Sequence, residues 1–356
     1  MNLTNSWDWY RISMYIDIQE VLKNPNEQWN KEYLSCNKYI TVDIIKNLKL
    51  PNATGNWNWY RISLFIDIKE VLKYPNELWN KIGLSGNKGI TVDIIKNLKL
   101  PNATDNWDWE SISEYTDIKQ VLKYSNETWN KKCLSRNECI TVDIIKNLKL
   151  PNATDNWKWK YISRCIDIKE VLKYRNEPWN KEYLSSNKDI TLDIIKHLKL
   201  PNATDNWNWY FISQCINIKE VLKYPNEQWD IYSLSRNKGI TVDIIKNLKL
   251  PNATGNWDWY YISMFIDIQE VIKYRNEPWN KVCLSGNKGI TVDIIKHLKL
   301  SNSAYNWDWY RISKVIDIKE VLKYPNETWD KICLSANEGI TLDIIDRKSK
   351  RLTSSH

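Results

Sequence analysis

The chain has 356 residues, and 51 basic against 43 acidic side chains give a net charge of +8, a mild excess that permits an anionic partner without requiring one. No stretch approaches 18 apolar residues, which excludes a membrane-spanning helix, and the first residues lack the basic and apolar regions of a secretory signal. The seven cysteines show no metal-ligand spacing such as C-x-x-C. We therefore expect small, unpaired thiols in a reducing compartment and a cytoplasmic protein that is not secreted.

Tryptophan spacing reveals an internal repeat. The 21 tryptophans occur three per copy, beginning with Trp7, Trp9 and Trp29 and recurring every fifty residues over seven copies. A constant period of this kind indicates a repeat array in which each unit packs mainly on its neighbours. We expect a single domain over residues 1–346, with copies at 1–50, 51–100, 101–150, 151–200, 201–250, 251–300 and 301–346, followed by a basic, flexible tail at 347–356.

Four helix starts follow one another in the first copy, at the capping residues Asp8, Asp17, Asn30 and Thr41. A side-chain oxygen at the N-cap accepts an otherwise unpaired N–H of the first turn and contributes about 1 kcal/mol. The apolar residue before each cap packs on the fifth residue after it as a hydrophobic staple. In the fourth copy Lys158 replaces the first cap, so we expect a weaker helix start there.

Further local signals support these helices. Glu20 lies three residues after Asp17, which predicts a capping box. Pro25 and Pro51 predict the ends of the second and fourth helices, and Asn37 suits a left-handed residue after the third.

The caps are only 9, 13, 11 and 17 residues apart, so each helix has two or three turns and depends on packing. The sequence therefore predicts an all-α fold, an α-solenoid of seven 50-residue repeats, each with two short helical hairpins and about 28 short helices in all.

The tryptophans are predicted to be core. Trp309, Ile312 and Ile316 share one helical face, while Trp307 precedes its cap and acts as the staple. Burying an indole removes roughly 200 Å² from water and contributes on the order of 5 kcal/mol before the entropy cost. The alternative, an exposed stacking platform, is disfavoured because residues two apart on a helix point in nearly opposite directions.

Comparison of the copies shows where the sequence varies. The segments "DIKEVLKY" and "TVDIIKNLKL" barely change, whereas helices that follow tryptophans change from copy to copy. These variable sides predict either one continuous binding surface or neutral drift of solvated positions, and their tyrosines and arginines favour binding of a protein partner along an extended surface. The candidate partner-binding residues are Tyr10, Arg11, Tyr60, Arg61, Leu64, Glu114, Tyr161, Arg164, Phe211, Gln214, Tyr260, Tyr261, Tyr310, Arg311 and Lys314.

Catalysis is not expected, because a near-perfect repeat supplies any constellation seven times or not at all. His197 and His297 stand where other copies have Asn, and there is no glycine-rich phosphate loop, so we expect no catalytic residue, metal or cofactor. Binding of nucleic acid along a lysine ladder is the alternative function. Against it, these lysines lie near helix C-termini, where they compensate the helix dipole. The ladder comprises Lys23, Lys46, Lys73, Lys96, Lys123, Lys146, Lys173 and Lys196.

Neither end of the array carries a recognisable polar capping repeat. Exposed end faces would promote end-to-end self-association, so a self-assembling structural protein is a further alternative. The tail, with Arg347, Lys348, Lys350 and Arg351, is either an anionic-surface patch or a frayed terminus.

The combination "PNATGNWDWYYIS…IDIQEVIKY…NEPWN…LSGN…ITVDIIKHL" resembles the short tryptophan-rich repeats, W-D-W-x-x-[IL]-S alternating with I-T-x-[DE]-I-[IV], of giant DNA viruses that infect amoebae, the Mimivirus-like group. The resemblance covers nearly the whole chain, although "WNK" stands for W-D-W in alternate half-repeats. It implies a viral protein of the host cytoplasm that engages host or viral factors; it implies no activity.

Overall fold

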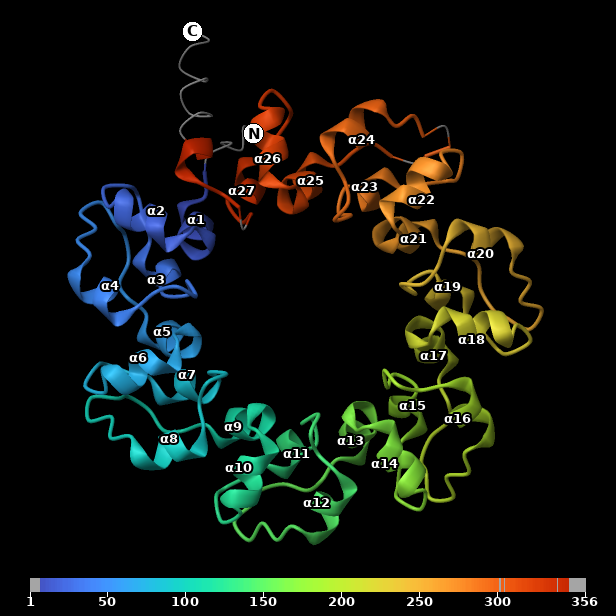
Figure 1. The fold of residues 1–356 in the computed structure, drawn as a ribbon, viewed down its shortest axis with the longest axis horizontal. Coiled ribbons are helices and arrows are strands. Elements are labelled where there is room, and N and C mark those ends of the chain that lie inside the picture. The colour runs from blue at the N-terminus through green and yellow to red at the C-terminus, as the bar shows by residue number, and fades with distance from the viewer. Residues whose placement is uncertain (1–6, 301, 304, 338, 346–356) are drawn as a thin grey trace. The chain divides into compact units, whose positions relative to one another are not determined.

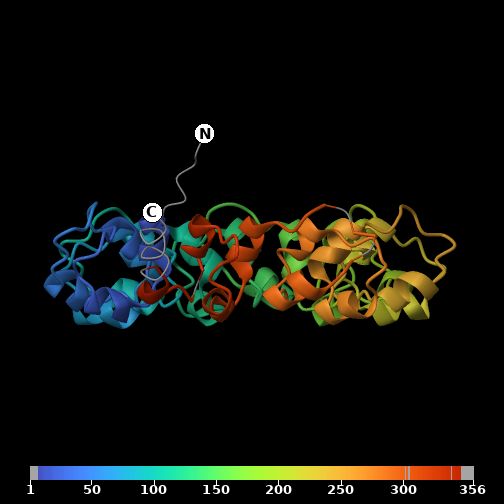
Figure 2. The ribbon, with the colours of Figure 1, turned by 90° about the horizontal axis from the view of Figure 1, so that it is seen from above.

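The computed structural model describes residues 7–300, 302–303, 305–337 and 339–345, which form short helices joined by irregular connections (Figures 1 and 2). Within these ranges the structure has 27 helices with defined first and last residues, and residues 342–345 are also helical. β-Pairing in these ranges is limited to isolated bridges, without strands. The fifty-residue repetition of helix pairs confirms the predicted all-α repeat solenoid. The predicted tail at 347–356 lies outside the described residues.

The described residues form two compact units. The first compact unit comprises the residues up to Gly89, Leu98–Trp107 and the residues from Asp267 onward, and the second comprises Ile90–Asn97 and Asp108–Ile266. The single domain over residues 1–346 stays a prediction.

The first helix of each copy starts at the predicted cap. In copy 1 the Asp8 carboxylate accepts from the N–H groups of Tyr10 and Arg11, and the helix buries Ile12 and Ser13. Lys158 makes no side-chain cap hydrogen bond, as predicted. The first helices are α1 (Trp9–Tyr15), α5 (Trp59–Phe65), α9 (Trp109–Tyr115), α13 (Trp159–Cys165), α17 (Trp209–Cys215), α21 (Trp259–Phe265) and α25 (Trp309–Val315).

The second helix is capped by Asp17, which accepts from Gln19 N–H, and it buries Val21. The predicted capping box is wrong in copy 2, where Glu70 is the equivalent of Glu20. Glu70 accepts from the N–H of Val42, 28 residues away, and so caps the fourth helix of the preceding copy. The second helices are α2 (Ile18–Lys23), α6 (Ile68–Lys73), α10 (Ile118–Lys123), α14 (Ile168–Lys173), α18 (Ile218–Lys223), α22 (Ile268–Lys273) and α26 (Ile318–Lys323).

The third helix is a single turn in most copies, shorter than predicted. Asn30 caps it, and the connecting segment supports it because Thr54 N–H donates to Trp29 O and Lys31 N–H donates to Thr54 O, both at 2.9 Å. The third helices are α3 (Lys31–Leu34), α7 (Lys81–Ser85), α11 (Lys131–Leu134), α15 (Lys181–Leu184), α19 (Ile231–Leu234), α23 (Lys281–Leu284) and α27 (Lys331–Leu334).

Asn37 follows the third helix without a positive φ, so the left-handed prediction is wrong. Its side chain is buried instead, and Nδ2 donates to Ile16 O (2.9 Å) while Oδ1 accepts from Tyr39 N–H (3.1 Å). Thr41 then caps the fourth helix, as predicted. The fourth helices are α4 (Val42–Asn47), α8 (Val92–Asn97), α12 (Val142–Asn147), α16 (Leu192–His197), α20 (Val242–Asn247) and α24 (Val292–His297).

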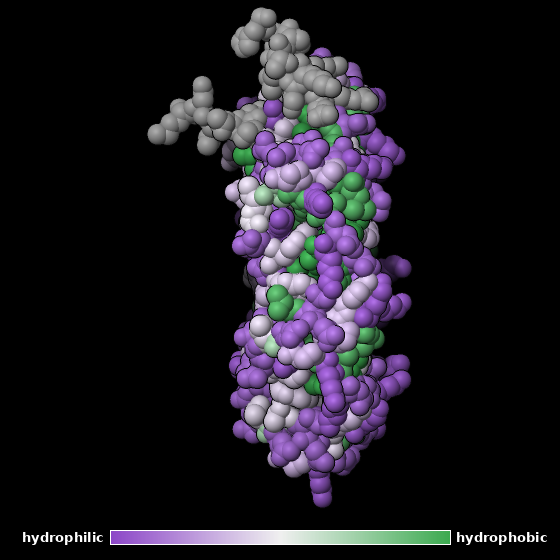
Figure 3. All heavy atoms as spheres, turned by 90° about the vertical axis from the view of Figure 1, so that its left-hand side faces the viewer, coloured by the Kyte–Doolittle hydropathy of each residue, from purple (hydrophilic) through white to green (hydrophobic). Residues whose placement is uncertain are grey.

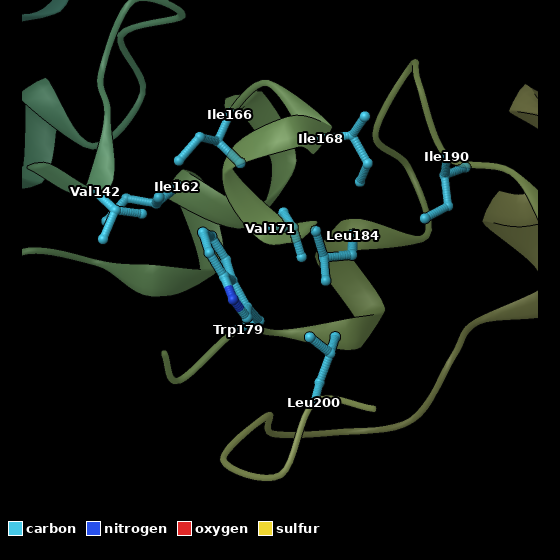
Figure 4. Close-up of a cluster of buried hydrophobic side chains, with 9 residues drawn as sticks. All are labelled: Val142, Ile162, Ile166, Ile168, Val171, Trp179, Leu184, Ile190 and Leu200. Atoms are coloured by element: carbon cyan, nitrogen blue, oxygen red, sulfur yellow. The ribbon is translucent and has the colours of Figure 1, made fainter. Parts of the chain in front are cut away.

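The third tryptophan of a copy is the centre of its core. Trp179 is fully buried, its Nε1–H donates to Tyr174 O at 2.7 Å, and its ring meets that of Trp159 edge to face at 5.1 Å. The prediction of a tryptophan core is confirmed for this position, whereas Trp157 and Trp159 are only half-buried. Figure 4 shows the cluster around Trp179: Val142, Ile162, Ile166, Ile168, Val171, Leu184, Ile190 and Leu200.

An invariant serine joins successive copies. Ser185 is fully buried, its hydroxyl donates to Lys181 O (2.8 Å), and its oxygen accepts the N–H of Asn208 at the start of the next copy (2.8 Å). Because the backbone N–H before a helix would otherwise lack a partner, this bond fixes one copy on the next.

The first and last copies meet through the same bond within the first compact unit. Asp8 N–H donates to Ser335 Oγ at 3.0 Å, and the Lys331 ammonium lies 6.0 Å from the Trp7 ring centroid. This contact corrects the expectation of exposed end faces, because Asp8 is bonded to Ser335 as Asn208 is bonded to Ser185.

Candidate functional site

The copy-specific side chains gather on one side of a repeat. In copies 1 and 4, the first and third helices lie on one side and the second and fourth on the other (Figure 1). The first helix carries positions 10, 11 and 14 of each copy, the third helix carries position 32, and position 36 follows the third helix; we name these five positions the variable surface. Most of these side chains are exposed or half-buried.

Variable positions of neighbouring copies contact each other. The guanidinium of Arg61 in copy 2 lies 3.6 Å from the Glu32 carboxylate, 3.4 Å from Cys36 Sγ and 5.2 Å from the Tyr33 ring centroid in copy 1. The Tyr33 ring packs in turn on Tyr10, with centroids 5.3 Å apart. A residue at position 11 therefore lies against the third helix of the preceding copy.

A similar contact occurs in the second compact unit, but there the arginine belongs to the earlier copy of the pair and the tyrosine to the later one. Arg136 lies 3.3 Å from the Glu114 carboxylate and 4.6 Å from the ring centroid of Tyr161 in the next copy. The guanidinium lowers the pKa of Tyr161, and the hydrogen bond to Tyr161 raises the pKa of Arg136. The arginine and the tyrosine thus lie on opposite sides of the two junctions, and the guanidinium stacks on the ring at both.

Arg236 lies among three tyrosines. Nη1 donates to the Tyr210 hydroxyl (2.6 Å), Nη2 donates to the Tyr232 hydroxyl (3.1 Å), and the guanidinium carbon lies 3.8 Å from the Tyr261 ring centroid. Burial opposes the charge, but Tyr210 and the other two tyrosines raise the pKa of Arg236. Tyr260 packs edge to face on Tyr261 at 5.1 Å and is itself exposed.

The other candidates are distributed over several junctions. Leu64 packs closely on Gly86, where an added Cβ would meet Leu64 Cδ1 at 2.8 Å. Arg11 and Arg311 pair with the caps of their own helices, at 3.2 and 3.4 Å. Phe211 packs on Tyr210. Of the remainder, Tyr60, Arg164, Tyr310 and Lys314 are exposed, and Gln214 is half-buried.

Sequence reasoning missed three members of these clusters, Arg136, Tyr232 and Arg236, although it noticed that their positions vary. The available signal was their pairing: an arginine at position 36 is followed 25 residues later by a tyrosine, as in Arg136 with Tyr161 and Arg236 with Tyr261. At both junctions this pairing places a cation over a ring.

Each lysine of the predicted ladder forms an ion pair with a carboxylate. Lys73 lies 3.2 Å from Asp43 and 4.7 Å from the Tyr74 ring centroid, and Tyr74 donates to the same carboxylate at 2.6 Å. Lys23 lies 3.8 Å from Glu20. The other ladder lysines pair with the next or preceding copy: Lys46 with Glu77, Lys96 with Glu127, Lys123 with Asp93, Lys146 with Glu177, Lys173 with Asp143 and Lys196 with Glu227.

The same type of contact occurs at Asp93, whose carboxylate is bonded by Lys123, Tyr124 and Gln120; we call these bonds the clasp. The clasp predicts that stability depends on pH through Asp93. Lys123 (2.6 Å), Tyr124 and Gln120 (3.1 Å) bond its carboxylate and lower the pKa of Asp93 to about 2. The pKa in the unfolded chain is about 3.9, so the stabilisation is present above that pH and is lost as the pH falls towards about 2.

Denaturant unfolding of the wild type and Asp93→Asn should therefore give stabilities that differ at pH 6 and converge as the pH falls. Asp189→Asn, at an exposed aspartate outside the clasp, is the control. A difference between wild type and Asp93→Asn that is constant with pH would contradict the assignment.

Exposed apolar residues form a second regular feature. Leu22, Leu72 and Leu222 are exposed on the second helices. Figure 3 views the side that carries α2, α4 and α6, and it shows hydrophobic residues as separate patches among hydrophilic ones. These leucines recur in the copies almost unchanged, so they do not distinguish one copy from another.

The expectation that the chain is not an enzyme stays a prediction. A surface hollow of about 930 Å³ lies between copies 1 and 2, but Glu70 in its lining is already bound to Val42 N–H. No group of three or more His, Cys, Asp or Glu in the described ranges is suited to hold a metal. Cys333 is buried, and desolvation raises the pKa of its thiol to about 11, which makes it unreactive.

No helix among the described residues is both long and apolar enough to cross a bilayer. Comparison of the chain with protein-family models, with curated proteins and with solved structures gives no match in any of the three.

Proposed function

We propose that the chain is a non-enzymatic repeat scaffold that binds a protein partner along the variable surface. The observation that carries the proposal is the stacking of copy-specific tyrosines and arginines across junctions, as at Arg136 with Tyr161 and at Arg236 with Tyr261. Tyrosine and arginine are the residue types enriched at interface hot spots, and side chains held in place before binding lose less entropy on association.

The two alternative functions receive less support. Nucleic-acid binding relied on the lysine ladder, and the carboxylates beside those lysines cancel much of the charge that phosphates would meet. Self-assembly relied on exposed end faces, whereas Asp8 of the first copy is bonded to Ser335 of the last. On the resemblance to giant-virus repeats alone, we propose a viral protein acting in the cytoplasm of the infected cell.

Site-specific photo-crosslinking tests the proposal. A photo-crosslinking amino acid at Tyr60 or Tyr260 reports on the variable surface, and the same residue at Leu72 or Leu222 reports on the second helices. The exposures are matched, at 46% and 39% against 48% and 47%. In an infected-cell extract, we expect crosslinks to one protein from the tyrosine positions and none from the leucine positions. Equal yields from both sets, or crosslinks to RNA, would reject the proposal.

A further inference from the structure

Arg236 differs from the other arginines at the junctions in its lack of a carboxylate. Arg61 lies near Glu32, Arg136 near Glu114 and Arg311 near Asp308. No Asp or Glu among the residues that the structure describes lies within 4.0 Å of the Arg236 guanidinium. Its positive charge is therefore held in place but not neutralised.

The guanidinium also retains unused donors. The two tyrosine hydroxyls take one N–H from each of Nη1 and Nη2, so each nitrogen keeps a second N–H without an acceptor in the described part of the chain. The Nε–H also has no acceptor there, but it is buried, so the donors left for a ligand are those of Nη1 and Nη2. A carboxylate accepts two parallel N–H bonds from a guanidinium, and such charge-assisted bonds are among the strongest in proteins.

Two further cations of the variable surface lie in the preceding copy. Lys160 lies 4.9 Å from the Tyr161 ring centroid, and Arg164 is exposed. Neither has a carboxylate within 4.0 Å in the described ranges. The helix that carries them, α13, also lacks an acidic cap because Lys158 stands there. On the variable surface of copies 4 and 5, the cations Lys160, Arg164 and Arg236 thus outnumber the one acid, Glu182.

The tyrosine rings around Arg236 are poorly arranged to stack on a nucleic-acid base. Base stacking requires a free ring face. The face of Tyr261 is covered by the Arg236 guanidinium, and its ring meets those of Tyr232 and Tyr260 at interplanar angles of 88° and 82°. The surroundings of Arg236 therefore favour a carboxylate over a base.

Resting on the proposed function, we propose that Arg236, with Tyr210, Tyr232 and Tyr261, binds an acidic segment of the protein partner. Lys160 and Arg164 extend the recognition of negative charge along the same segment. The tyrosines hold the guanidinium in a fixed orientation and shield it from water, which strengthens the bond to an incoming carboxylate.

Fluorescence anisotropy of labelled octaglutamate with the full chain tests this inference at near-physiological salt. We expect Arg236→Gln to weaken binding about 10-fold, the loss of one bidentate charge-assisted pair. Arg236→Lys keeps the charge without the planar fork and should also weaken binding. Arg136→Gln is the matched control, because Glu114 already occupies that arginine, and it should change binding less than about 2-fold.

Thermal melts followed by circular dichroism confirm that each variant is folded. Failure of octaglutamate to bind, equal binding by wild type and Arg236→Gln, or tighter Arg236-dependent binding of an oligothymidine would overturn the inference. If crosslinks from Tyr60 and Tyr260 to a protein persist in Arg236→Gln while octaglutamate fails to bind, only the acidic-segment inference fails. If the wild-type chain gives no such crosslinks, the proposed function fails.

Discussion

Replacing Trp179 with alanine is expected to lower the free energy of unfolding by about 4 kcal/mol, the range observed when a large aromatic side chain is removed from a core. The ring is fully buried and packs on Trp159, so the substitution leaves a cavity and also removes the 2.7 Å hydrogen bond to the Tyr174 carbonyl. Chemical denaturation of the full chain measures the loss.

The matched control for Trp179 is Leu172→Ala, because Leu172 is exposed on the same copy. We expect a change below about 0.5 kcal/mol there. Since repeat arrays need not unfold in one step, hydrogen exchange should show the loss of protection centred on copy 4 and its neighbours. Similar costs for Trp179→Ala and Leu172→Ala would contradict the assignment of the third tryptophan as core.

Replacing Ser335 with alanine should cost about 2 kcal/mol, because it removes a buried hydroxyl that bonds Lys331 O and leaves the N–H of Asp8 unpaired. Ser185→Ala is the matched comparison, since Ser185 makes the same two bonds between copies that are consecutive in the chain. Equal losses are expected if the first copy packs on the last as each copy packs on its predecessor.

Denaturant unfolding of the two serine variants, with all other conditions equal, gives the comparison. If Ser185→Ala loses about 2 kcal/mol while Ser335→Ala matches the wild type, the contact between the first and last copies is absent in solution. A lower melting temperature on dilution, for the wild type, would point instead to copies meeting between chains.

The helix starts were predictable from the sequence because their causes are local. Asp8, Asp17, Asn30 and Thr41 each accept a backbone N–H two or three residues away, so spacing alone is sufficient. The all-α repeat fold follows from these caps and from the tryptophan period. The absence of a cap bond at Lys158 was predictable for the same reason.

The errors arose where the partner lies more than twenty residues away along the chain. Glu70 bonds Val42 N–H, and Asn37 bonds the carbonyl of Ile16, so the sequence neighbours of these residues gave the wrong expectation. The sequence correctly predicts that Lys73 lies near a helix C-terminus, but it does not indicate that Lys73 pairs with Asp43, 30 residues away. Position 36 was missed as part of the site because Arg236 meets Tyr210, 26 residues before it, and Tyr261, in the next copy, only in the folded chain.

The central claim is that copy-specific residues bind the partner while invariant residues build the array. Side-chain oxidation footprinting of the wild-type chain, alone and with the purified protein that crosslinking identifies, tests this claim most directly. The account predicts that the partner protects Tyr60, Tyr260 and Tyr310 and leaves Leu72 and Leu222 as reactive as in the chain alone. Protection of the leucines with unchanged reactivity of the tyrosines would contradict it.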